Sequence, residues 1–126
     1  MSKNKNQLFV VILCAQWCAV CRQFKIDIQE FSKQTNNRVC WLDVETSSEW
    51  ADEFEIDNFP TILLVDANNQ VLFLGSIEPN LNTLAQLIRT LTQQQTSVSV
   101  SQEVRHLVER VTTRFAEYKN SFLDLS

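Results

Sequence analysis

Two cysteines that stand three residues apart are the residues of this chain best suited to chemistry. Cys18 and Cys21 lie in the stretch AQWCAVCR, directly after Trp17. A pair with this spacing can bind a metal ion, pack as ordinary core residues, or open and close a disulfide. The elements on either side of the pair decide among these uses.

A strand leads into the pair and a helix follows it. The run from Leu8 to Cys14 is apolar and rich in β-branched residues, which is typical of a strand covered on both faces. From Val20 onward, apolar residues at helical spacing predict an amphipathic helix. Cys18 therefore falls at the helix N-terminus, where unpaired backbone N–H groups favour its thiolate form, and Cys21 lies one turn deeper.

The different settings of the two thiols favour redox chemistry over metal binding. An exposed Cys18 can attack a disulfide, and a sheltered Cys21 can resolve the mixed disulfide that results. A zinc site usually takes a second pair of ligands, and His106 is the only histidine. Cys14 and Cys40 lie in apolar strand patterns and are interpreted as core residues. We expect no metal here, and a set of all four thiolates is the alternative.

The rest of the chain alternates between strands and helices. Further strands are predicted at Val39–Val44, Thr61–Val65 and Val71–Leu74, and helices at 47–57 and from Leu81 to Leu91. The residues Ala67–Gln70 are expected to form the tight turn of a hairpin. This order predicts an α/β fold, with a mixed sheet of about four strands and flanking helices.

A polar segment separates the C-terminal part of the chain from this α/β unit. Because Thr92 to Ser97 is linker-like, residues 1–94 are predicted to form one domain, and residues 95–126 a linker and a helical extension. The extension carries a wide apolar stripe at Val104, Leu107, Val108, Val111, Phe115, Tyr118 and Phe122. So wide a stripe favours packing back onto the same chain, with a two-fold dimer as the alternative.

Composition excludes several classes of protein. Of the 126 residues, 44% are hydrophobic and 21% are charged, so we expect a packed core. The net charge of −4 argues against non-specific binding to nucleic acid. No apolar stretch approaches the ~20 residues of a membrane helix, and the run from Leu8 to Ala15 fits a buried strand better than a signal peptide. We therefore expect a cytoplasmic protein with no membrane partner.

Taken together, these motifs resemble the thioredoxin family. The matching pieces are Trp17-Cys18-Ala19-Val20-Cys21, then Phe59-Pro60-Thr61 before an apolar strand, then the hairpin to Gly75. The resemblance implies that Cys18 is the nucleophile, that Cys21 resolves, and that Pro60 is a cis-proline facing the two sulfurs. It also implies a substrate-docking rim made of Trp17, Phe59, Pro60, Thr61, Leu74 and Gly75.

The chain departs from the family pattern between the cysteines and on two strands. Ala19-Val20 replaces the usual Gly-Pro. The buried acid of the family falls at Ile12, and the basic residue that often accompanies it falls at Trp41. Help in deprotonating the resolving thiol must then come from Asp43, Glu45, water or the substrate.

The region of resemblance also starts about one strand and one helix later than is usual in the family. Without a first strand, the strand at Val39–Val44 would be an open sheet edge unless another segment covers it. We expect a monomer, or a homodimer formed through that edge or through the C-terminal helix.

The sequence thus predicts a thiol–disulfide oxidoreductase that reduces or exchanges protein disulfides through a Cys18–Cys21 couple. Its partners would be a disulfide-containing client protein and an external reductant or reductase, in electron transport and cell redox homeostasis. No dissociable cofactor and no nucleic acid are needed. The alternative is a thioredoxin-like interaction module or adaptor in which redox chemistry is secondary.

Overall fold

The computed structural model describes residues 7–15, 18–43, 60–94, 96–117 and 122–125. In chain order they form β1 (Phe9–Cys14), α1 (Ala19–Ser32), β2 (Arg38–Asp43), β3 (Thr61–Val65), β4 (Val71–Ser76), α3 (Leu81–Gln94), α4 (Gln102–Glu117) and β5 (Phe122–Leu125). The α/β class predicted from the sequence is confirmed. The helix predicted at 47–57 lies outside the described residues. None of the helices in the described part is long and apolar enough to cross a membrane.

The strands form one mixed sheet in the order β4-β3-β1-β2-β5. Strand β1 is parallel to β2 and antiparallel to β3, while β3 and β4 form an antiparallel hairpin. The most continuously apolar strand, β1, therefore lies at the centre of the sheet. This position agrees with its sequence, because a central strand covered on both faces needs apolar side chains on both.

The fifth strand was not predicted. The apolar stripe places Phe122 on the C-terminal helix, but α4 ends at Glu117, and Phe122 begins β5. Strand β5 runs parallel to β2, with Val39 opposite Phe122 and Leu42 opposite Leu125. So short a strand needs a neighbour to satisfy its backbone groups, and the edge of β2 supplies that neighbour. That edge is therefore covered by the chain itself.

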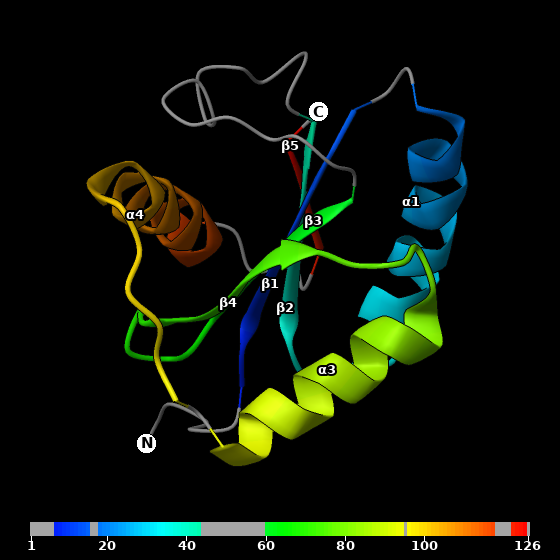
Figure 1. Cartoon of the computed structure of the whole chain (residues 1–126). Coiled ribbons are helices and arrows are strands. Elements are labelled where there is room, and N and C mark those ends of the chain that lie inside the picture. The colour runs from blue at the N-terminus through cyan, green and yellow to red at the C-terminus, as the bar shows by residue number, and fades with distance from the viewer. Residues whose placement is uncertain (1–6, 16–17, 44–59, 95, 118–121, 126) are drawn as a thin grey trace.

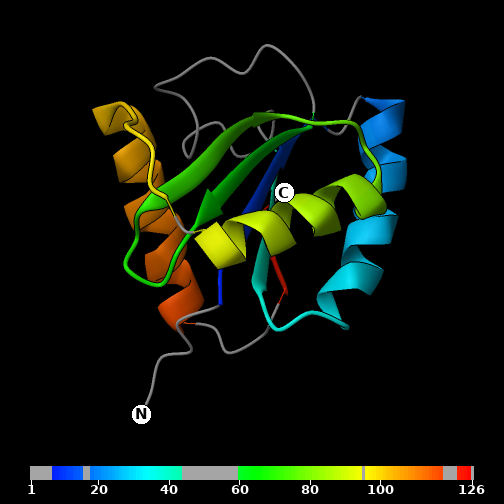
Figure 2. The ribbon, with the colours of Figure 1, turned by 60° about the horizontal axis from the view of Figure 1, so that its bottom comes forward.

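Helices cover both faces of the sheet (Figures 1 and 2). Helices α1 and α3 pack on one face and α4 on the other. Along β1, Val10, Ile12 and Cys14 belong to the core cluster shared with α1 and α3, whereas Val11 and Leu13 belong to the cluster shared with α4. This alternation follows from the two-residue period of a strand, and it decides which side chains of β1 can meet α1.

The C-terminal segment packs onto the sheet of its own chain. The α4 residues Val104, Leu107, Val108 and Val111 are buried in the same cluster as Leu63 of β3. Before α4, the Val98 N–H donates a 2.8 Å hydrogen bond to the Val71 carbonyl of the edge strand β4. The segment thus contributes to the core and to both sheet edges. The division between residues 1–94 and 95–126 stays a prediction.

The hairpin between β3 and β4 turns where the sequence predicts it. Asn69 has a positive φ of 65°, which asparagine tolerates better than most residues. The Asp66 carboxylate accepts hydrogen bonds from the Asn68 and Gln70 N–H groups, at 2.8 and 2.9 Å. This turn, together with a register shift between Leu64 and Val65, places Gly75 opposite Ile62.

Candidate active site

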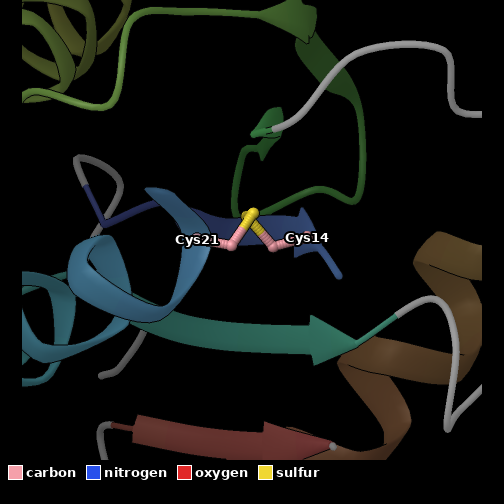
Figure 3. The surroundings of a disulfide bond; sticks show 2 residues. All are labelled: Cys14 and Cys21. Atoms are coloured by element: carbon pink, nitrogen blue, oxygen red, sulfur yellow. A yellow bond between two sulfur atoms is a disulfide. The ribbon is translucent and has the colours of Figure 1, made fainter. Parts of the chain in front are cut away.

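A disulfide joins Cys14, the last residue of β1, to Cys21 in the first turn of α1 (Figure 3). Their Cα atoms are 5.9 Å apart, and the two residues are 0% and 1% exposed. The sequence predicts Cys18 as the partner of Cys21 and Cys14 as an unpaired core residue. The structure buries Cys14 but bonds it. The physical reason is strand alternation, which points Cys14 toward α1 together with Val10 and Ile12.

Cys18 is a free thiol, partly buried, at the N-terminus of α1. It is the N-cap residue, with an extended backbone (φ −84°, ψ 118°), and its carbonyl accepts the Arg22 N–H at 3.1 Å. Its side chain makes no capping hydrogen bond, so the sulfur is not engaged by the helix terminus. The structure thus places this cysteine at the helix N-terminus, where the sequence predicts it.

Cys21 lies within reach of two other cysteines. Cys14 is bonded to it, and Cys18 precedes it by one turn of the helix. Cys18 packs against the apolar cluster that contains Cys21, and a spacing of three residues at the start of a helix is that of redox-active Cys-x-x-Cys pairs. The sulfur of Cys21 therefore has two candidate partners, one buried in the sheet and one near the surface.

Asp43 is a buried carboxylate beside Cys14. It is 1% exposed, it ends β2, and its Cα pairs with that of Cys14 in the parallel β1–β2 ladder. Val39 and Trp41 of the same strand face α1 and α3, so alternation directs Asp43 to that face too. Of the two acids that the sequence offers as helpers, Asp43 is the one placed beside the cysteines. The other, Glu45, lies outside the described residues.

Pro60 and Thr61 lie at the same end of the sheet as the disulfide. Thr61 pairs with Leu13, and continuing the antiparallel register by one step brings Pro60 level with Cys14. Both residues are buried, and the Pro60 carbonyl accepts the Ile77 N–H at 3.3 Å. The expected cis bond involves Phe59, which lies outside the described residues, as does Trp17.

The other two predicted docking residues lie farther from the cysteines. Gly75, partly exposed on β4, pairs with Ile62 of β3. A Cβ at Gly75 would lie 3.2 Å from the ring of Phe73, so a larger residue would crowd that ring. Leu74 packs against the cluster under α4, on the face opposite the cysteines. The structure therefore does not bring Leu74 together with the disulfide.

Sequence reasoning missed two features of this site. The sequence predicts Cys14 as a core residue only, although its place in the period-two pattern of β1 indicates the face that it shares with Ile12. Val20, between Cys18 and Cys21, is 47% exposed and adds apolar surface to the first turn of α1.

Cys40 lies apart from the other three cysteines. It faces α4 from β2, fully buried. Burial in apolar surroundings, and secondarily the Asp124 carboxylate, raise the pKa of its thiol far above the usual value. Cys40 faces α4 while Cys14 and Cys21 face α1, so the structure does not gather the four sulfurs of the four-thiolate alternative around one point. Among the described residues, no group of three His, Cys, Asp or Glu is placed to hold a metal.

Comparisons with known proteins point to one family. The family model Thioredoxin matches residues 2–93. The thioredoxin of Buchnera aphidicola is 34% identical over 71 residues, which cover 55% of this chain and 65% of that protein. The bifunctional thioredoxin reductase/thioredoxin of Mycobacterium leprae is 30% identical over 70 residues, 54% of this chain and 15% of that protein. The chain thus spans less than two thirds of each relative.

A solved structure gives the same fold. The thioredoxin of Fasciola hepatica superposes with a TM-score of 0.59 at 24% sequence identity, covering 68% of this chain and 82% of its own. The order of elements, the cysteine pair at the strand–helix junction and the family model, which covers most of the 126 residues, agree with one another. The chain belongs to the thioredoxin family.

Proposed function

We propose that this protein reduces or exchanges disulfides in client proteins, with Cys18 as the nucleophile and Cys21 as the resolving thiol. The observation that carries the proposal is the position of Cys18: a free, partly exposed thiol at a helix N-terminus, one turn from a second cysteine. Disulfide exchange begins with attack by an accessible cysteine in its thiolate form. Membership in the thioredoxin family supports the same chemistry.

The reaction needs Cys21 as a thiol, so an external dithiol or reductase must first open its bond to Cys14. The Cys18 thiolate then attacks one sulfur of the client disulfide, and the other client sulfur leaves as a thiolate. Cys21 loses its proton and attacks the Cys18 sulfur, which releases the second client thiolate. The client gains two electrons and the chain loses them, which leaves a Cys18–Cys21 disulfide until an external dithiol or reductase reduces it again.

Asp43 is the group best placed to accept the proton of the resolving thiol. It lies beside Cys14, with which Cys21 shares a bond, and it is almost fully buried. A carboxylate within hydrogen-bond reach of a thiol can act as a general base. In this proposal Asp43 serves the function of the buried acid that this chain lacks at position 12.

The client would bind around Cys18. Val20 offers exposed apolar surface on the first turn of α1, Pro60 directly precedes β3, and Thr61 and Gly75 lie on β3 and β4. Trp17 and Phe59 keep their proposed docking roles by family resemblance. We place the protein in the cytoplasm, where thiols stay reduced and disulfides are mostly transient.

An insulin-reduction assay with matched cysteine variants tests the proposal. Cys18→Ser should abolish reduction, whereas Cys21→Ser should accumulate mixed disulfides that a non-reducing gel separates. Cys40→Ala serves as the control, because this thiol lies on the other face of the sheet, and it should reduce insulin like the unmodified chain. Full activity in Cys18→Ser, or no more trapping in Cys21→Ser than in Cys18→Ser, would contradict the proposal.

A second function, that of an interaction module, draws support from the Cys14–Cys21 bond. While that bond is closed, Cys21 is not available to resolve a mixed disulfide. A chain that binds a client but fails to reduce insulin, even after full reduction by a dithiol, would favour this alternative.

A further inference from the structure

We propose that Cys14 is a third redox thiol of this site, which takes over the bond to Cys21 and returns Cys18 to its free form. The inference rests on the proposed function, because its starting point is the Cys18–Cys21 disulfide that turnover leaves behind. Nothing in the chemistry of a two-cysteine site requires a third thiol, so the role proposed for Cys14 goes beyond that chemistry.

The geometry places Cys21 between two partners. Cys14 and Cys21 are joined with their Cα atoms 5.9 Å apart. Cys18 is one helical turn from Cys21 and packs against the core cluster that contains both other cysteines. Disulfide exchange requires an attacking, a central and a leaving sulfur to come together. In the proposed step Cys14 attacks, Cys21 is central and Cys18 leaves.

The exchange step needs no outside oxidant. Cys14 loses its proton, attacks the Cys21 sulfur of the Cys18–Cys21 bond, and forms the Cys14–Cys21 bond. The bond between Cys21 and Cys18 breaks, and Cys18 leaves as a thiolate that takes a proton from solvent. One disulfide is broken and one is formed, so the chain as a whole is neither oxidised nor reduced. Asp43, in register with Cys14, is placed to receive the Cys14 proton.

The exchange moves the disulfide into the core and leaves Cys18 as the free thiol. The Cys14–Cys21 bond lies in the core, where both residues are almost fully buried, while Cys18 stays partly exposed. A mixed disulfide then formed at Cys18 cannot be resolved, because Cys21 is occupied. The oxidised chain should therefore hold a protein or small-molecule thiol at Cys18, whereas the reduced chain releases it.

The inference can be tested by titrating the fully reduced, native chain with dithiobis(nitrobenzoate). The number of thionitrobenzoate anions released per chain shows how many of the exchange steps take place. Attack by Cys18 releases one thionitrobenzoate anion, and resolution by Cys21 releases a second. If Cys14 then frees Cys18, a third anion is released and one label stays on the protein. The expected result is about three anions per chain and about one retained label, as the exchange stoichiometry requires.

Two variants isolate the role of Cys14. Cys14→Ala should release about two anions per chain and retain no label, because the Cys18–Cys21 bond is then the end point. Cys40→Ala is the matched control: this cysteine is equally buried, on the neighbouring strand, but faces α4. It should behave like the unmodified chain.

A peptide map of the unmodified chain decides the question even if Cys14→Ala fails to fold. Mild oxidation, acid quenching and non-reducing mass spectrometry should give a Cys14–Cys21 cross-link with Cys18 alkylatable. A Cys18–Cys21 cross-link with release of about two anions would overturn the inference and leave the proposed function intact. Release of about one anion with a persistent label would overturn both, since Cys21 would then not resolve.

Discussion

Both faces of the sheet carry a buried apolar cluster, yet they hold cysteines of different kinds. Under α1, Cys14 and Cys21 are bonded to each other, and Cys18 packs against the same cluster. Under α4, Cys40 has no second cysteine in its cluster, and burial raises its pKa. We therefore expect a helix N-terminus and a second sulfur nearby, rather than burial, to distinguish a reactive cysteine in this fold.

The two faces also draw on different parts of the chain. The α1 face is built mainly from elements between Leu8 and Leu91, whereas the α4 face depends on the C-terminal segment. If the faces are as separate as their clusters indicate, changes under α4 should alter the free energy of unfolding and leave the chemistry of Cys18 unchanged. The following predictions test that separation, beginning with the largest effect.

Alkylation should distinguish Cys18 from Cys40 by the widest margin. The raised pKa of Cys40 leaves almost none of it as thiolate at neutral pH, and its burial blocks the reagent. We expect Cys18 of the reduced chain to react with iodoacetamide on the order of a thousandfold faster or more than Cys40. Timed quenching and mass spectrometry measure both rates. Comparable labelling of the two in native protein would refute the contrast drawn here.

The same raised pKa predicts how Cys40 affects the free energy of unfolding at alkaline pH. In the unfolded chain the thiol ionises near its ordinary value of about 8.5, while in the folded chain it stays protonated. The unfolded state therefore binds fewer protons above that pH, and stability should fall as the pH rises from about 8 to 10. Urea titrations should show less of this fall in Cys40→Ala.

Truncation of a core residue of α4 should give the next largest effect. Leu107 is fully buried against the sheet. Leu107→Ala leaves a cavity and should lower the free energy of unfolding by about 2–5 kcal/mol. Val98→Ala, at an exposed position, should change it by less than about 0.5 kcal/mol. The rate of Cys18 alkylation should be unchanged in both, and a slower rate in Leu107→Ala would show that the faces are coupled.

Much of this fold follows from local pattern. The apolar run at Leu8–Cys14, the helix after Cys18 and the strand Thr61–Val65 all appear where the sequence predicts them. Each of these elements buries a fixed face, so the spacing of its apolar residues predicts whether it is a helix or a strand. Strand β5 differs, because its four residues form a strand only beside the edge of β2. No local pattern can reveal a partner that lies far along the chain.

The site divides in the same way. The sequence predicts the place of Cys18 at a helix N-terminus, because an apolar strand pattern ends and a helical pattern begins there. The bond between Cys14 and Cys21 depends on how α1 lies over β1, which is a property of tertiary packing. Asp43 was one of several candidates from sequence, and the β1–β2 register is what places it beside Cys14.

Asp43→Asn should change only the chemistry of the cysteines under α1. If Asp43 accepts the proton of the resolving thiol, the second step of disulfide exchange should slow by about 10–100-fold, while attack by Cys18 keeps its rate. Rapid mixing with a chromogenic disulfide separates the two steps. Asp66→Asn is the control, since this carboxylate is also buried but belongs to the hairpin turn. An equal slowing of both steps in Asp43→Asn would assign the residue a structural role.

The smallest effect tests an ion pair that joins helix α1 to strand β5. Lys25 of α1 contacts the Asp124 carboxylate of β5 at 2.9 Å and lies 5.8 Å from the centre of the Trp41 ring. Both side chains are about two-thirds or more buried, at 27% and 35% exposure, so the pair is less screened than one in open solvent.

Lys25→Ala should therefore lower the free energy of unfolding by about 0.5–1 kcal/mol, through loss of the ion pair and of the cation–π contact. The matched control is Lys33→Ala, which removes a helix-surface pair with Glu30 at 71% and 65% exposure and should cost less. A double-mutant cycle with Asp124→Asn isolates the pairwise energy. If Lys25→Ala and Lys33→Ala cost the same, the contact does not stabilise β5. Strand β5 would then be held by its ladder with β2 and by the packing of Phe122 against the cluster under α1.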